Sequence, residues 1–131
     1  MGQSNQSRLL QIARWLAAEF PTPFPVVVRC PKKIAADPGD KPSIRLTGYY
    51  GYTVRIGQKI HIRIAVRPGI NLWIQIDTLL HEWAHATTTR QSKIEDARLA
   101  HGAHDDEWAL AFGRIYRRYY DDDGSEDSKG F

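Results

Sequence analysis

The chain of 131 residues has little cysteine and no long apolar run. Its one cysteine, Cys30, cannot form an internal disulfide, and it excludes a zinc cluster built from several cysteines. No apolar run approaches the length of about 20 residues that a membrane-spanning helix needs. The first residues lack the basic start and apolar stretch of a signal peptide. We therefore expect an intracellular, cytoplasmic protein with no membrane partner.

Charge is distributed unevenly along the chain, although its total is only +3. The tail 121–131 holds five acids and one lysine, a net charge of −4, which leaves +7 for residues 1–120. The length fits a single domain, which we expect to span residues 1–120, followed by a disordered acidic tail. A basic body favours a polyanionic partner, and a solvated surface is the alternative explanation of the same charges.

Apolar residues recur at helical spacing in three segments of the chain. The first segment, 4–20, begins with a Ser-Asn pair that can cap a helix, and a proline-rich stretch follows it. The second segment, 71–90, begins at another capping residue, Asn71. The third segment, 105–122, has acids at its start and arginines near its end, which suits the dipole of a helix. The sequence therefore predicts three helices.

Between the first two predicted helices, apolar and polar residues alternate as they do in β-strands. Residues 26–30 form a short β-branched run, and the segment 49–66 alternates in two halves. If both apolar sets face one core, Ile56 must lie opposite Ile60, and the two strands must be joined by a three-residue loop, 57–59. We therefore predict an α+β fold with an antiparallel sheet.

The polar positions of these strands are rich in cations. Arg55, Lys59 and Arg63 are predicted to form a basic strand face that could contact DNA or an acidic substrate. A solvated outer face of the sheet is the alternative explanation. The alternation places Tyr50 and Tyr52 toward the core rather than on this face.

The segment LLHEWAHATTT, residues 79–89, holds two histidines four positions apart with a glutamate directly after the first. On a helix, His81 and His85 project from one face and can bind the same ion, and zinc accepts neutral imidazole nitrogen. Glu82 lies beside that face, where it can take a proton from a water that the metal activates. The motif matches by chance in roughly one of 140 chains of this composition. We therefore predict a zinc site with Glu82 as general base.

A catalytic zinc ion needs a third protein ligand and one open position. Glu95, His101 and His104 are the candidates downstream of the motif. Metzincin spacing is excluded, because its glycine and its third histidine would fall on Thr88 and Gln91. The residues alone leave the three candidates open, and a helix with two unrelated histidines is the alternative to a zinc site.

The segments TLLHEWAHA and HDDEWALAFGRIYRRY together resemble the SprT-like (Spartan-type) metallopeptidases and their smaller phage relatives. In that family a segment containing a third histidine and an aromatic residue opens the helix that follows the motif. Aligning that aromatic with Trp108 implies a Zn²⁺ ion held by His81, His85 and His104, whereas aligning the His-Gly pair would select His101. We predict His104 as the third ligand, because it also precedes an amphipathic helix at the right offset. The resemblance implies a small zincin-like fold and a protein substrate that could be bound to DNA.

Two other functions fit the same residues. The first is a non-catalytic, zinc-containing module that binds nucleic acid or protein through the basic strand face. The second is a peptidase that cuts a repressor, as zincins of phage regulation do. A peptidase depends on Glu82, whereas a binding module should tolerate the loss of its carboxylate.

Overall fold

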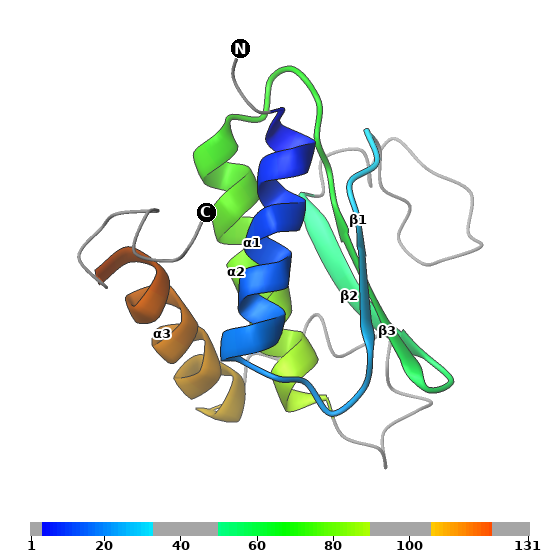
Figure 1. Cartoon of the computed structure of the whole chain (residues 1–131), viewed down its shortest axis with the longest axis vertical. Helices are drawn as coiled ribbons and strands as arrows, with labels where there is room; N and C mark the ends of the chain where they lie inside the picture. Colours follow the sequence, from blue (N-terminus) through cyan, green and yellow to red (C-terminus); the bar gives the residue numbers. More distant parts are fainter. Residues whose placement is uncertain (1–3, 33–49, 90–105, 122–131) are drawn as a thin grey trace.

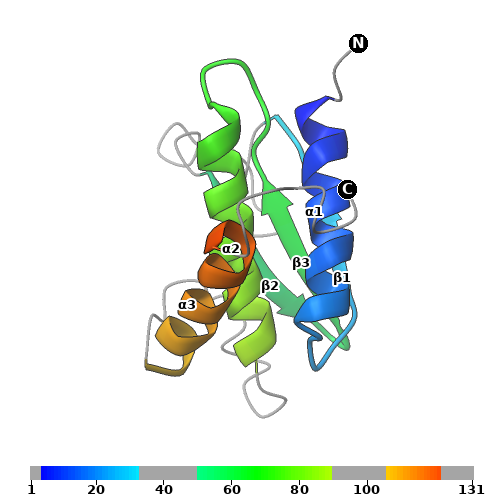
Figure 2. The same cartoon turned by 60° about the vertical axis from the view of Figure 1, so that its left-hand side comes forward.

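The computed structural model describes residues 4–32, 50–89 and 106–121. In chain order the elements are α1 (Asn5–Glu19), β1 (Val26–Arg29), β2 (Gly51–Ile56), β3 (Lys59–Ile64), α2 (Leu72–Thr88) and α3 (Asp106–Asp121). Helices α1 and α2 cover one face of the sheet, and α3 packs against α2 on the side away from it (Figure 1, Figure 2). The predicted α+β class is confirmed. No helix among these residues is both long and apolar enough to cross a bilayer.

The first two helices begin where the sequence supplies a capping side chain. Ser4 Oγ accepts a hydrogen bond of 3.1 Å from the backbone N–H of Ser7. Asn71 Oδ1 accepts one of 2.9 Å from the backbone N–H of Ile74. These side chains satisfy amide groups that have no partner within the first turn of a helix. Both predicted helix starts are therefore confirmed.

The sheet is mixed, with strand order β1-β3-β2, so the predicted antiparallel sheet is wrong for one of its two strand pairs. β2 runs antiparallel to β3, whereas β1 runs parallel to it. Alternation with a period of two identifies a strand and its two faces, but it carries no information about strand direction. The long connection between β1 and β3 permits the parallel pair, which a short hairpin could not form.

The hairpin between β2 and β3 turns through two residues, Gly57 and Gln58, rather than the predicted three. Arg55 pairs with Ile60, where the prediction had paired Ile56 with that residue. Gly57 has a φ of 61°, a conformation that glycine adopts readily and that tight hairpin turns require. A register shift of one residue exchanges the two faces of a strand, so the other side of β2 faces the helices.

This register places two polar residues of β2 against the helices. Thr53 and Arg55 are only 2% and 4% exposed, and the guanidinium carbon of Arg55 lies 4.4 Å from the ring centre of Phe24. Arg55 is therefore not part of the predicted basic strand face, because its side chain is buried on the opposite side of the sheet. Tyr52 is buried, but on the opposite face of β2 from Thr53 and in a small cluster apart from the core that faces the helices. Tyr50 is 46% exposed, so the predicted place of both tyrosines in that core is wrong.

The main core lies between the sheet and the helices. Trp83 of α2 belongs to it, and its indole N–H donates a hydrogen bond of 2.9 Å to the carbonyl oxygen of Phe20, just after α1. Dense packing of this kind gives α2 a fixed position over the sheet. The principal buried side chains are Leu9, Ile12 and Leu16 of α1, Ile60, Ile62 and Ile64 of β3, Ile76, Leu79, Leu80 and Trp83 of α2, and Ile115 and Tyr119 of α3.

Candidate metal centre

The C-terminal half of α2 brings together three of the predicted site residues. The potential ligand atoms of His81, Glu82 and His85 all lie within 4.8 Å of one another. The ring centres of the two histidines are 5.1 Å apart, and Nε2 of His81 is 3.9 Å from Oε2 of Glu82. Glu82 and His85 are buried, whereas the His81 side chain is 30% exposed. This cluster can hold a metal ion, and solvent reaches the cluster at the partly exposed side chain of His81.

Thr53 of β2 fixes the position of the glutamate. Its Oγ1 lies 2.7 Å from Oε1 of Glu82 and 3.0 Å from the backbone carbonyl oxygen of the same residue. The hydroxyl has one proton, so it donates to one of these acceptors at a time. One carboxylate oxygen is thereby tied to the sheet, while the other faces the histidine pair. Thr53 could not be predicted from the sequence, because it lies 29 residues from Glu82 and only the packing of β2 on α2 brings the two side chains together.

The environment of Glu82 changes its acidity. Burial raises the pKa of the Glu82 carboxyl to about 7, and the hydrogen bond from Thr53 opposes this rise. Burial has this effect because it deprives the charged form of hydration. A carboxyl with a pKa near neutrality can accept and return a proton at neutral pH, as a general base must. A cation bound beside it would favour the charged form and lower this pKa.

Trp108 of α3 packs against both histidines. Its ring centre lies 4.9 Å from that of His81 and 5.4 Å from that of His85, on which it stacks. Its indole N–H donates a hydrogen bond of 3.3 Å to the carbonyl oxygen of His81. Trp108 had been singled out as the aromatic residue of the family resemblance, and these contacts were not predicted. Contact with a large, rigid ring restricts the rotation of both imidazoles.

The predicted third ligand, His104, lies outside the described residues, and so do the alternatives His101 and Glu95. Helix α3 begins two residues after His104, and its first turn contacts the histidine pair through Trp108. His104 and Trp108 are four positions apart, which corresponds to at most about 14 Å of extended chain. The described residues do not test this ligand, so His104 stays a prediction.

The other cations of the predicted basic strand face lie on β3. Lys59 is exposed and Arg63 is partly exposed. The pKa of His61, which lies between them, is lowered by partial burial and by the charges of Arg63, Lys59 and Arg29. Arg29 belongs to β1 and pairs with Arg63, and it was not among the predicted cations of this face because no pairing had been predicted for residues 26–30. The cations of this outer sheet face are thus Arg29, Lys59 and Arg63, without Arg55.

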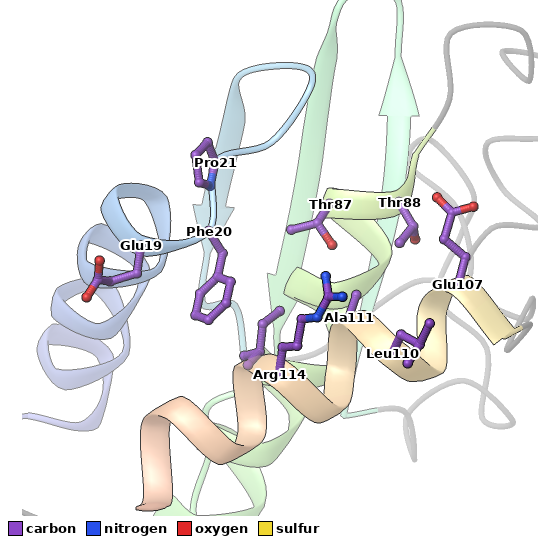
Figure 3. A pocket seen from close by; sticks show the side chains of 10 residues that line it. Glu19, Phe20, Pro21, Thr87, Thr88, Glu107, Leu110, Ala111 and Arg114 are labelled. Atoms are coloured by element: carbon purple, nitrogen blue, oxygen red, sulfur yellow. The ribbon is translucent and has the colours of Figure 1, made fainter. Parts of the chain in front are cut away.

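A separate pocket of about 370 Å³ lies where the ends of α1 and α2 meet the start of α3 (Figure 3). Thr87 and Thr88 line it from α2, and Leu110 and Arg114 line it from α3. None of the three clustered site residues contributes to its lining. The pocket is therefore distinct from the candidate metal centre.

Comparisons with known proteins identify no family for this chain. The chain matches no protein-family model, no curated protein and no solved structure. The resemblance to SprT-like peptidases therefore rests on the two motif segments, and the function has to be argued from the site itself.

Proposed function

We propose that the chain is a zinc-dependent peptidase in which Glu82 is the general base. The observation that carries this proposal is the buried Glu82 carboxylate beside the two histidines, with one of its oxygens held by Thr53. Burying a carboxylate is unfavourable. If the two histidines were unrelated, or if the zinc ion had a purely structural role, the burial of this carboxylate would have no function to offset its cost. A proton acceptor held next to the metal does have such a function.

The donor set supports zinc as the metal. Imidazole nitrogen suits zinc and other transition metals, whereas calcium and magnesium prefer oxygen ligands. His81 and His85 would hold the ion, and we propose His104 as the third protein ligand. When bound, the zinc ion supplies a Lewis acid that makes water a nucleophile near neutral pH.

The two oxygens of Glu82 would have different tasks. Oε1 would accept the hydrogen bond from Thr53, which orients the carboxylate. Oε2 faces the histidine pair, where it would accept the proton of the attacking water and return it to the leaving amine. Because the carboxylate is already fixed and partly desolvated, little reorganisation is needed when the proton moves.

The test compares zinc-loaded wild-type protein with Glu82→Gln on a mixture of fluorescence-quenched peptides. We expect the variant to retain zinc and its kcat to fall at least about a hundredfold, which is the lower end of the contribution that a general base typically makes. Glu19→Gln is the matched control, because Glu19 is an exposed glutamate of α1 that pairs with Arg118. Its activity should equal that of the wild type.

Each result has a defined meaning. An unchanged kcat in Glu82→Gln would show that Glu82 is not the general base. Zinc binding without hydrolysis in the wild type would leave the non-catalytic zinc module as the better account. Repeating the assay with a protein substrate bound to DNA tests the substrate class that the resemblance implies.

A further inference from the structure

A continuous row of aromatic rings runs from the metal centre along α3. Trp108, Phe112, Tyr116 and Tyr120 are spaced four residues apart, and their consecutive ring centres lie 5.1, 5.7 and 4.5 Å from one another. Residues with this spacing share one face of a helix. Trp73, in the first turn of α2, extends the row by stacking on Tyr120 at 6.0 Å. We term these five residues the aromatic row.

The far end of the aromatic row is open to solvent. Trp73 is 65% exposed and Tyr116 is 42% exposed, although burying rings of this size would be favourable. The Tyr120 hydroxyl donates a hydrogen bond of 2.6 Å to Oδ1 of Asp77, which anchors the row to α2. Exposed tryptophan and tyrosine side chains that are held in place contribute strongly to binding, because little rotamer freedom is lost.

The charges beside the aromatic row favour a polypeptide over a nucleic acid. A site for single-stranded nucleic acid combines stacking rings with a groove of cations. On α3, Arg118 pairs with Glu19 of α1 at 2.7 Å, and Arg114 lines the pocket near the end of α1 (Figure 3). Arg117 is the remaining arginine of α3, and the charged side chain in contact with a ring of the row is the carboxylate of Asp77.

We propose that the aromatic row binds apolar side chains of the peptide substrate on one side of the bond that is cleaved. The inference rests on the proposed peptidase function. Side chains on one face of an extended peptide recur about every 6.8 Å, and residues four apart on α3 advance about 6.0 Å along the helix axis. A peptide lying along α3 can therefore place alternate side chains on successive rings. The preferred substrate is an unfolded segment with aromatic or aliphatic residues at alternate positions.

The experiment reads binding without turnover. Zinc-loaded Glu82→Gln protein is titrated with two fluorescein-labelled peptides of equal length and charge, and fluorescence anisotropy gives each Kd. One peptide carries leucine or phenylalanine at alternate positions, and the other carries serine there. We expect the apolar peptide to bind at least about tenfold more tightly, and Trp73→Ala or Tyr116→Ala each to weaken it about tenfold. Neither side chain belongs to the buried core, so their truncation should leave the fold intact.

Leu110→Ala is the matched control. Leu110 is 63% exposed on the same helix but lines the pocket rather than the aromatic row (Figure 3). Its truncation should leave the Kd of the apolar peptide unchanged. Equal affinity for the two peptides, or an equal loss in Leu110→Ala and Trp73→Ala, would overturn the inference.

Other outcomes separate the aromatic row from its alternatives. Tight binding of an oligothymidine that Trp73→Ala abolishes would assign the row to nucleic acid and overturn the proposal. A dimer in sedimentation that Trp73→Ala converts to a monomer would assign it to a second copy of the chain and also overturn it. A rate of hydrolysis that depends neither on the apolar residues of the peptide nor on Trp73 would refute peptide binding by the aromatic row but not the peptidase function. Selective binding with no wild-type hydrolysis would support the row and refute the peptidase.

Discussion

Replacing Thr53 with valine would remove the hydroxyl that holds Glu82 while it nearly preserves the shape of the side chain. Thr53 and Glu82 are both buried, with Thr53 only 2% exposed. Oγ1 of Thr53 lies 2.7 Å from Oε1 of Glu82. A buried hydrogen bond to a charged group contributes about 1.5–3 kcal/mol. If all of that energy keeps the carboxylate in its reactive position, its loss lowers kcat by roughly ten- to a hundredfold.

The assay measures kcat and KM on one quenched peptide with zinc-loaded protein. For Thr53→Val we expect kcat to fall and KM to stay constant, because the hydroxyl contacts Glu82. Thr53→Ser keeps the hydroxyl and should restore most of the kcat. Thr87→Val is the matched control, since that hydroxyl donates to the carbonyl oxygen of Ala84 at 2.9 Å. Wild-type kcat in Thr53→Val with full zinc occupancy would refute the reasoning.

Three further predictions test the packing of the fold and of the site. Gly51→Ala should lower the free energy of unfolding by about 1–3 kcal/mol in urea titrations, because a Cβ there would lie 2.6 Å from Cγ2 of Thr78; an unchanged midpoint would contradict the close approach of β2 and α2. Trp108→Leu should weaken zinc binding about tenfold in competition with a chelator, because both imidazoles lose their packing; equal affinity would mean that the ring does not support the ligands. Burial raises the pKa of the Cys30 thiol to about 11 from 9.0, so alkylation by iodoacetamide at pH 8 should be about a hundredfold slower than in the urea-unfolded chain; equal rates would show that the thiol is not buried.

The helices of this fold could be predicted because their signals are local. The cap at Asn71 and the apolar stripe that follows it lie within a few turns of chain, and α2 begins where they indicate. The HEWAH pattern is equally local, so the closeness of His81, Glu82 and His85 followed from the helix alone.

The sheet could be predicted only in part, because its errors concern contacts between distant segments. The alternation in β2 was recognised, but which of its faces meets the helices depends on a hairpin register that differs by one residue. Arg55 was therefore assigned to the surface, although it is buried over Phe24. Thr53 and Trp108 reach the site across 29 and 27 residues of sequence, and no spacing rule connects them to the motif.

The central claim is that the histidines of α2 form a zinc centre, and the zinc content per chain tests it most directly. Protein purified without chelator is dialysed against zinc and then against buffer, and the metal is counted by mass spectrometry. We predict about one zinc ion per wild-type chain and far less in His81→Ala, His85→Ala and His104→Ala. A wild-type chain that retains no zinc would contradict the account, and full occupancy in His104→Ala alone would move the third ligand to another residue.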